Sequence, residues 1–325
     1  MLASLSPKII QDLILENYAE YISLFGEFQS RFLADLNRRY QGLDNGHLVL
    51  YFEKKSHQGI LRRKDYDLNF DLGFDKFWQN HSEIIIEPTT ITTISKDTQL
   101  PKETARRKIS NLVKHKILNK KLKHIGWLPN EHYKKSYNEF VGEEIAQVSK
   151  LIKYVTKKTN FNIFQNNIEN EFKNKFSFYW FHYLSTQLKY MSLWKKQFED
   201  LEVLLIVLQI STVLAGKAKL DKVSHASLYK NPKTVRAMFD YNKTSLSATS
   251  ISDVTGISRA TCVRKLNTMV ESKMLTQDDI TRRYFLRPEA FSYDQASKEV
   301  TLEVVKIFSE FYFIFTRALT SKASN

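Results

Sequence analysis

The spacing of apolar residues predicts a pair of short helices near residue 100. Ala105, Ile109 and Leu112 recur at i, i+4 and i+7, which gives a helix over Lys102–His115 one buried stripe. A shorter helix is expected before it, over Ile91–Thr98, because threonines stand at a suitable N-cap position. The two helices and the turn between them form a helix-turn-helix pattern.

The same pattern occurs again near residue 257. Cys262, Leu266 and Met269 form the buried stripe of a helix expected over Arg259–Ser272, and a shorter helix is expected over Ile251–Thr255. The expected N-caps are Thr89 or Thr90, Ser250 and Ser258, and Pro101 suits the first turn of its helix, where its missing N–H costs nothing.

The two patterns are copies of one sequence. Ile94–Leu118 and Ile251–Leu275 align without a gap at an offset of 157. The identical positions in the first copy are Ile94, Ser95, Thr98, Thr104, Arg107, Lys108, Val113, Lys116 and Leu118. The offset also relates the helices expected near Asn17–Tyr40 and Asn174–Lys196, and near His47–Phe52 and Leu204–Gln209. Longer helices are expected over Tyr133–Val155 and Ala296–Leu319.

A short hairpin is expected after each helix pair. The strands are Leu118–Leu122 with Ile125–Leu128, and Leu275–Gln277 with Arg282–Leu286. Helix, turn, helix and hairpin make the winged variant of the motif. Both copies resemble the recognition helices of winged-helix bacterial regulators. In the second copy the matching residues are Ser258, Arg259, Thr261, Arg264, Leu266, Met269, Lys273 and Leu275. In the first copy they are Pro101, Lys102, Thr104, Arg107, Ile109, Leu112, Lys116 and Leu118. Where that family usually has a glycine, this chain has His115-Lys116 and Ser272-Lys273.

The order of elements is similar to that of MarR-type regulators, in which helices flanking the winged segment form a dimer interface. We expect two halves, 1–157 with a winged segment at about 88–129, and 158–325 with one at about 247–288. The predicted fold is mainly α with small β-hairpin wings, in which long helices join the two winged modules into a pseudo-dimer. A homodimer of the whole chain is left open.

Charge and composition narrow the class of partner. The formal net charge is +14, which favours a polyanion, and the scarcity of Gly (9) and Pro (6) favours helices. Cys262 is the single cysteine, so no internal disulfide or multi-cysteine zinc site is expected. We find no uninterrupted apolar segment for a signal peptide or membrane span, and no phosphate loop or nucleophile elbow. The expectation is a cytoplasmic, nucleoid-associated protein that is not an enzyme and uses no metal or cofactor.

The outer faces of the second helices and the hairpins supply the candidate DNA contacts. Residues expected at base edges are Lys102, Thr104, Arg106 and Arg107, and Arg259, Thr261 and Arg264. Residues expected at phosphates are Lys108, Lys120, Lys121, Lys123, Lys265, Arg282 and Arg283. Because Lys102–Lys123 is denser in positive charge, we expect the first module to bind double-stranded DNA more strongly.

These patterns favour a sequence-specific transcriptional regulator that reads two adjacent, non-identical major-groove half-sites. The alternatives are a plasmid-type replication initiator, which also has tandem winged helices, and a winged-helix scaffold for protein partners. Aromatic clusters at 176–194 and 308–315 indicate packing between the two halves or, less favoured, a pocket for an unassigned effector. Target genes, operator sequence and direction of control are not determined by the sequence.

Overall fold

The chain is mainly helical, with two small antiparallel sheets of two strands each in the part that is described. The computed structural model describes residues 5–84, 89–121, 124–159, 165–217, 224–226, 245–286 and 295–323. The first elements are α1 (Pro7–Glu16), α2 (Tyr18–Tyr40), α3 (Leu43–Tyr66), η1 (Phe74–Lys76), α4 (Phe77–Glu83), α5 (Ile91–Thr98), α6 (Lys102–Lys114), β1 (Leu118–Lys121) and β2 (His124–Trp127). They are followed by α7 (Glu131–Lys158), α8 (Gln165–Asn174), α9 (Phe176–Phe198), α10 (Leu201–Lys217), α14 (Ala248–Thr255), α15 (Arg259–Glu271), β3 (Leu275–Gln277), β4 (Tyr284–Leu286) and α17 (Gln295–Ala323).

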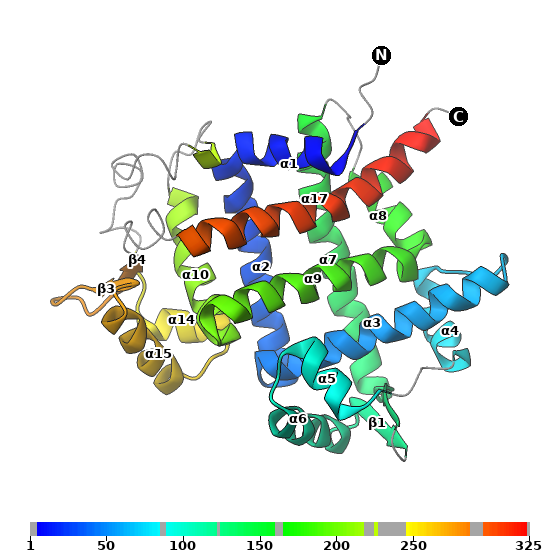
Figure 1. Ribbon diagram of the computed structural model, residues 1–325, viewed down its shortest axis with the longest axis horizontal. Coiled ribbons are helices and arrows are strands. Elements are labelled where there is room, and N and C mark those ends of the chain that lie inside the picture. The colour runs from blue at the N-terminus through cyan, green and yellow to red at the C-terminus, as the bar shows by residue number, and fades with distance from the viewer. Residues whose placement is uncertain are drawn as a thin grey trace. The chain divides into compact units, whose positions relative to one another are not determined.

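The repeat seen in the sequence is also a repeat of local structure. At the offset of 157 residues, α5 and α14 begin and end at equivalent positions, and so do α6 and α15. Each pair is followed by an antiparallel two-stranded sheet, β1–β2 in the first copy and β3–β4 in the second (Figure 1). The helices and hairpins predicted in each copy are therefore present.

One expected N-cap was wrong. We expected Ser250 to cap the first helix of the second copy, but α14 begins three residues earlier, with Ser247 as its cap. Ser247 has extended backbone, and its hydroxyl accepts a hydrogen bond from the Ser250 N–H at 3.0 Å. Thr90, the equivalent residue of the first copy, accepts one from the Thr93 N–H at 3.2 Å. The first helix of each copy is thus capped by a hydroxyl residue at the equivalent position.

The residues that replace the usual glycine adopt the conformation a glycine would take. Lys116 has a φ of 57° and Lys273 a φ of 60°. The Lys116 N–H bonds to the Val113 carbonyl at 3.0 Å, and the Ile117 N–H bonds to the Leu112 carbonyl at 3.0 Å. This is the Schellman pattern that ends a helix, and the second copy repeats it. The turn keeps its geometry without glycine.

The chain packs as two compact units that take in segments from both ends of the sequence. One unit contains Met1–Leu43 and Leu193–Phe313, and the other contains Asp44–Ser192 and Ile314–Asn325. Each unit therefore combines segments of the predicted halves 1–157 and 158–325. Those halves describe the sequence repeat, whereas the units describe which segments contact one another.

In the first unit, α2 packs against α10 and α14 (Figure 1). Buried polar contacts join these helices: Ser30 donates to the Gln209 side chain at 2.6 Å, and the Asn37 amide donates to the Thr255 carbonyl at 3.1 Å. The end of α14 is thereby tied to α2. The second helix-turn-helix of the chain is held by a helix that lies more than 200 residues earlier in sequence.

Aromatic side chains supply much of the core of each unit. In the first unit, the ring centroids of Phe25 and Phe308 are 4.7 Å apart. In the second, those of Phe77 and Phe176 are 5.3 Å apart, and the Tyr183 hydroxyl donates to the Glu144 carboxylate at 2.7 Å. These contacts join residues of the two sequence halves, as the packing interpretation of the aromatic clusters expects.

Candidate nucleic-acid interface

The outer face of α6 carries an exposed row of cations. Its buried stripe of Ala105, Ile109 and Leu112 lies against the rest of the second unit, as predicted. On the opposite face Lys102, Arg106, Arg107 and Lys114 are exposed, and Thr104 is half-buried. The sequence analysis missed Lys114, although its spacing of seven residues from Arg107 puts both on one helix face.

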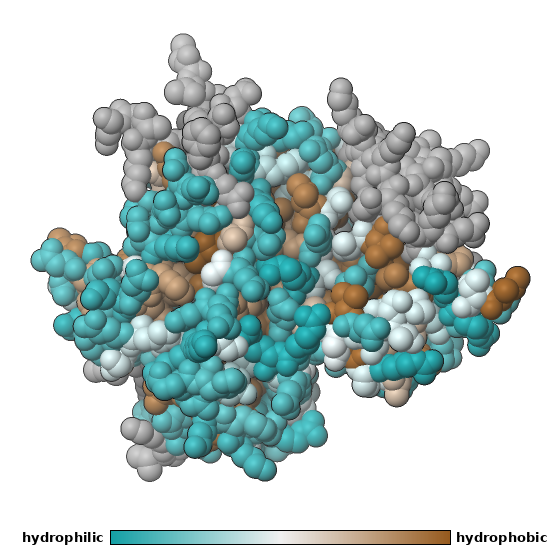
Figure 2. All heavy atoms as spheres, turned by 180° about the vertical axis from the view of Figure 1, so that it is seen from behind, coloured by the Kyte–Doolittle hydropathy of each residue, from teal (hydrophilic) through white to brown (hydrophobic). Residues whose placement is uncertain are grey.

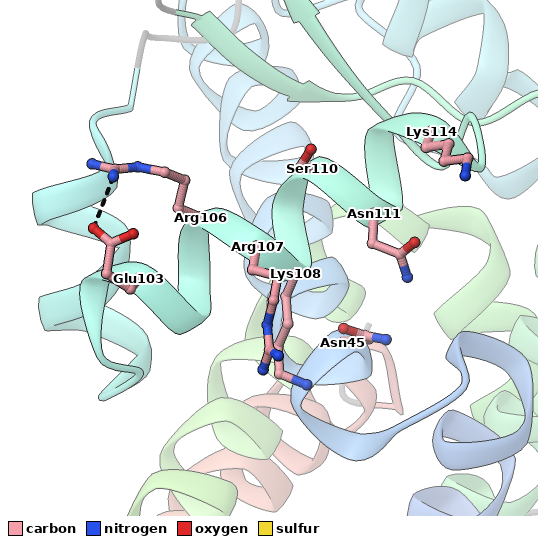
Figure 3. A pocket seen from close by; sticks show the side chains of 8 residues that line it. All are labelled: Asn45, Glu103, Arg106, Arg107, Lys108, Ser110, Asn111 and Lys114. Carbon is pink, nitrogen blue, oxygen red and sulfur yellow. Dashed lines mark hydrogen bonds and ion pairs between the residues drawn. The ribbon is translucent and has the colours of Figure 1, made fainter.

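An open cavity of about 700 Å³ lies between this face and the start of α3. Its lining residues are Asn45, Glu103, Arg106, Arg107, Lys108, Ser110, Asn111 and Lys114. Figure 3 shows the side chains of Arg107 and Lys108 extending together toward the start of α3, where Asn45 lies. Arg106 points the other way and pairs with Glu103 at 2.8 Å. The cationic face therefore has two parts, and only one borders α3.

The outer face of α15 is built in the same way but carries fewer cations. Arg259 and Arg264 are exposed, and the Arg259 Nε donates to the Thr249 hydroxyl at 3.2 Å. Thr261 is half-buried, and its hydroxyl accepts a hydrogen bond from the helix-capping Ser258 at 2.8 Å. Val263, the counterpart of Arg106, is half-buried. The two exposed arginines therefore lie on the solvent-facing side of this helix.

Lys265, which we expected at a DNA phosphate, does not lie on the exposed face of α15. Lys265 is only 8% exposed, and its ammonium group pairs with Asp200 and, at 3.1 Å, with Glu202. Asp200 precedes α10 and Glu202 lies in its first turn. The residue therefore anchors α15 to α10 and is removed from the candidate surface. Sequence alone did not distinguish this lysine from an exposed one.

The equivalent lysine of the first copy makes a weaker version of this anchor. Lys108 lies 3.6 Å from the carboxylate of Asp44, in the first turn of α3, and the two side chains are 23% and 32% exposed. Both copies thus link the middle of the second helix to an acid at the start of an equivalent helix, which is α3 in the first copy and α10 in the second. The lysine is buried in the second copy and partly exposed in the first, whereas the acids are partly exposed in both.

The cationic hairpin residues that we expected at phosphates differ in their exposure and hydrogen bonding. Lys120 and Arg282 are exposed. Arg283 is also exposed, but its guanidinium group donates to the Ser245 carbonyl at 3.1 and 3.3 Å. Lys121 belongs to β1 but its side chain is outside the described residues, and Lys123 lies entirely outside them.

The tip of the second hairpin carries a negative charge and an exposed apolar residue. Hydrogen bonds from Thr281 hold the pKa of the Asp278 carboxyl below its usual value. Ile280 is 92% exposed, the highest value among the large apolar side chains that are described. The sequence analysis did not single out Ile280. Figure 2 shows a face of the molecule that is mostly hydrophilic where it is coloured, with hydrophobic residues in separate patches.

The two faces differ in net charge. Residues 102–116 contain six Lys or Arg and one Glu, for a net +5, whereas 259–273 contain four and one, for a net +3. Leaving out Lys108 and Lys265, which are paired with acids, lowers these values to +4 and +2. The first copy therefore keeps the larger positive charge after the paired lysines are left out.

Other candidate chemistry is limited. Cys262 is buried, and burial raises the pKa of its thiol, so the reactive thiolate is disfavoured. Within the ranges described, His, Cys, Asp and Glu side chains form no group of three or more that could hold a metal ion. Over the same ranges, no helix combines the length and apolar character needed to cross a membrane.

Comparison of the chain with family models, curated proteins and solved structures finds no match in any of the three.

Proposed function

We propose that this protein is a sequence-specific double-stranded DNA-binding regulator of transcription, with two non-identical winged helix-turn-helix modules. The observation that carries the proposal is the repeated helix, turn, helix and hairpin, in which each second helix leaves its arginines exposed. Two copies of this arrangement with cationic outer faces are harder to explain as solvated surface than one copy would be.

The geometry of B-DNA explains why this face suits the task. The major groove admits one α-helix, and side chains on the first two turns of that helix reach the base edges. Arginine bonds guanine O6 and N7 simultaneously, which is worth about 1–3 kcal/mol of discrimination. We assign base contacts to Arg107 and Arg264, and to Thr104 and Thr261, whose short side chains permit close approach. Lys120 and Arg282 are assigned to phosphates.

The differences between the two modules lead to an expectation about the site. Because α6 and α15 differ in their outer residues, the preferred sequence is an imperfect repeat of two half-sites, about 34–36 Å apart if the modules occupy successive turns of one groove. As a pseudo-dimer similar to MarR-type regulators, one chain would occupy both. We place the protein with the nucleoid in the cytoplasm and assign no effector, cofactor or catalytic activity.

The test is selection of bound duplexes from a random library by the full chain, followed by affinity measurements at several salt concentrations. We expect one enriched motif and a logarithmic salt slope of several units. Arg107→Ala and Arg264→Ala should each relax the preference at one position by about tenfold. Arg63→Ala removes the same charge at the far end of α3 and should leave the motif unchanged.

The outcome also separates the rival functions. Failure to retain any duplex would refute the proposal and favour a protein-binding scaffold. A genome-wide binding map with scattered promoter sites supports a regulator, whereas one cluster of direct repeats at an origin would identify a replication initiator.

A further inference from the structure

We propose that Asp44 attenuates DNA binding by holding Lys108 away from a backbone phosphate in the cavity between α6 and the start of α3. The inference rests on the proposed function and adds a regulator of affinity to that surface. It concerns the unit that contains α3 and α6, so both partners of the ion pair belong to one packed body.

The cavity has the chemistry of a phosphate site. Lys108 lines it together with two amide side chains, those of Asn111 on the next turn of α6 and of Asn45 at the start of α3 (Figure 3). Ammonium and amide groups are among the donors that proteins direct at phosphate oxygens. At about 700 Å³ and open to solvent, the cavity is large enough for a phosphodiester group.

The ion pair between Lys108 and Asp44 is placed to compete with that phosphate. Its 3.6 Å separation exceeds the 2.7–2.9 Å typical of a charge-assisted hydrogen bond, and both side chains are partly exposed. Such pairs are weak, and a lysine on its flexible four-carbon stem can change partners. Asp44 lies in the first turn of α3, where the helix dipole favours the ionised carboxylate. Binding a phosphate therefore requires Lys108 to leave Asp44.

The second copy shows the same link without the freedom to open. Lys265 is buried and held by two carboxylates, so neutralising one of them leaves it paired with the other. The chain thus contains its own matched control at an equivalent position, offset by 157 residues.

The experiment measures the affinity and salt slope of the full chain for a duplex chosen by selection. We expect Asp44→Asn to tighten binding about twofold to fivefold, the equivalent of one partly exposed ion pair. The salt slope should become steeper by about 0.9, because one more cation is free to displace a counterion. Asp44→Ser provides a second neutral variant, and the two should agree if the charge is responsible.

The proposal requires that the tighter binding of Asp44→Asn depend on the presence of Lys108. In a Lys108→Met background, Asp44→Asn should give no tightening, and Asp200→Asn in the wild-type background should give none either. Equal tightening with and without Lys108, or no tightening at all, would overturn the proposal while leaving DNA binding established. If the wild-type chain retains no duplex, the proposed function fails first and the attenuation fails with it.

Discussion

Replacing Lys265 by methionine should be tolerated, whereas neutralising its two acidic partners should not. The Lys265 side chain is almost fully buried, but Asp200 and Glu202 are 40% and 31% exposed. Water can therefore solvate the carboxylates when the ammonium is lost. It cannot solvate the ammonium when both carboxylates are lost.

The expected free energies follow from this asymmetry. Lys265→Met keeps an unbranched chain of similar length in the buried space, so we expect a loss of at most about 1.5 kcal/mol. Lys265→Ala also removes about three methylenes, at about 0.8 kcal/mol each, for a loss of roughly 2–3 kcal/mol. The double variant Asp200→Asn, Glu202→Gln leaves a buried charge unpaired and should cost about 3–5 kcal/mol. Asparagine keeps the oxygen of Asp200 that accepts from the Glu202 N–H at 2.8 Å, so the helix cap is retained.

Urea titration followed by circular dichroism measures these differences in the free energy of unfolding. Lys108→Met is the matched control, because its pair is open to water and should contribute less than about 1 kcal/mol. A double acidic variant as stable as the wild type, or a Lys265→Met variant less stable than the double acidic variant, would contradict the reasoning. Lys265→Met should also leave the salt slope of DNA binding unchanged, since this residue is assigned no phosphate.

Two further predictions concern stability. Gly256→Ala should lower the free energy of unfolding by about 1–3 kcal/mol, because φ is +72° there and the new Cβ would lie 2.7 Å from the Cγ of Arg38; a variant that melts with the wild type would contradict this strain. Burial lowers the pKa of His81 from 6.5 to about 4, so between these values the unfolded chain binds a proton that the folded chain does not. Stability should therefore be greatest above pH 6.5 and fall by roughly 3 kcal/mol toward pH 4, with the buried His57 adding in the same direction. His81→Phe should flatten this dependence in acid titrations at fixed urea concentration, and an unchanged slope would exclude His81 as its source.

Sequence spacing predicted the helices and hairpins of the two repeated segments, although one cap, Ser250, was wrong. The apolar stripes of α6 and α15, the caps at Thr90 and Ser258 and the hairpins after them all depend on residues within a few positions of one another. The spacing of apolar residues along a helix shows which face is buried. The opposite, exposed face and its arginines could therefore be predicted from that spacing. The repeat reinforced each of these assignments by supplying a second instance.

Tertiary structure decided which elements meet and therefore which charges are free. Periodicity identifies a buried face but not the helix that covers it, so the pairing of Met1–Leu43 with Leu193–Phe313 was not predictable from either segment. Lys108 and Lys265 are identical in the alignment, yet Lys108 is partly exposed beside Asp44, whereas Lys265 is buried and pairs with both Asp200 and Glu202. The physical reason is that a lysine's role depends on its distance to carboxylates far along the chain and on the water that packing excludes, and local spacing encodes neither.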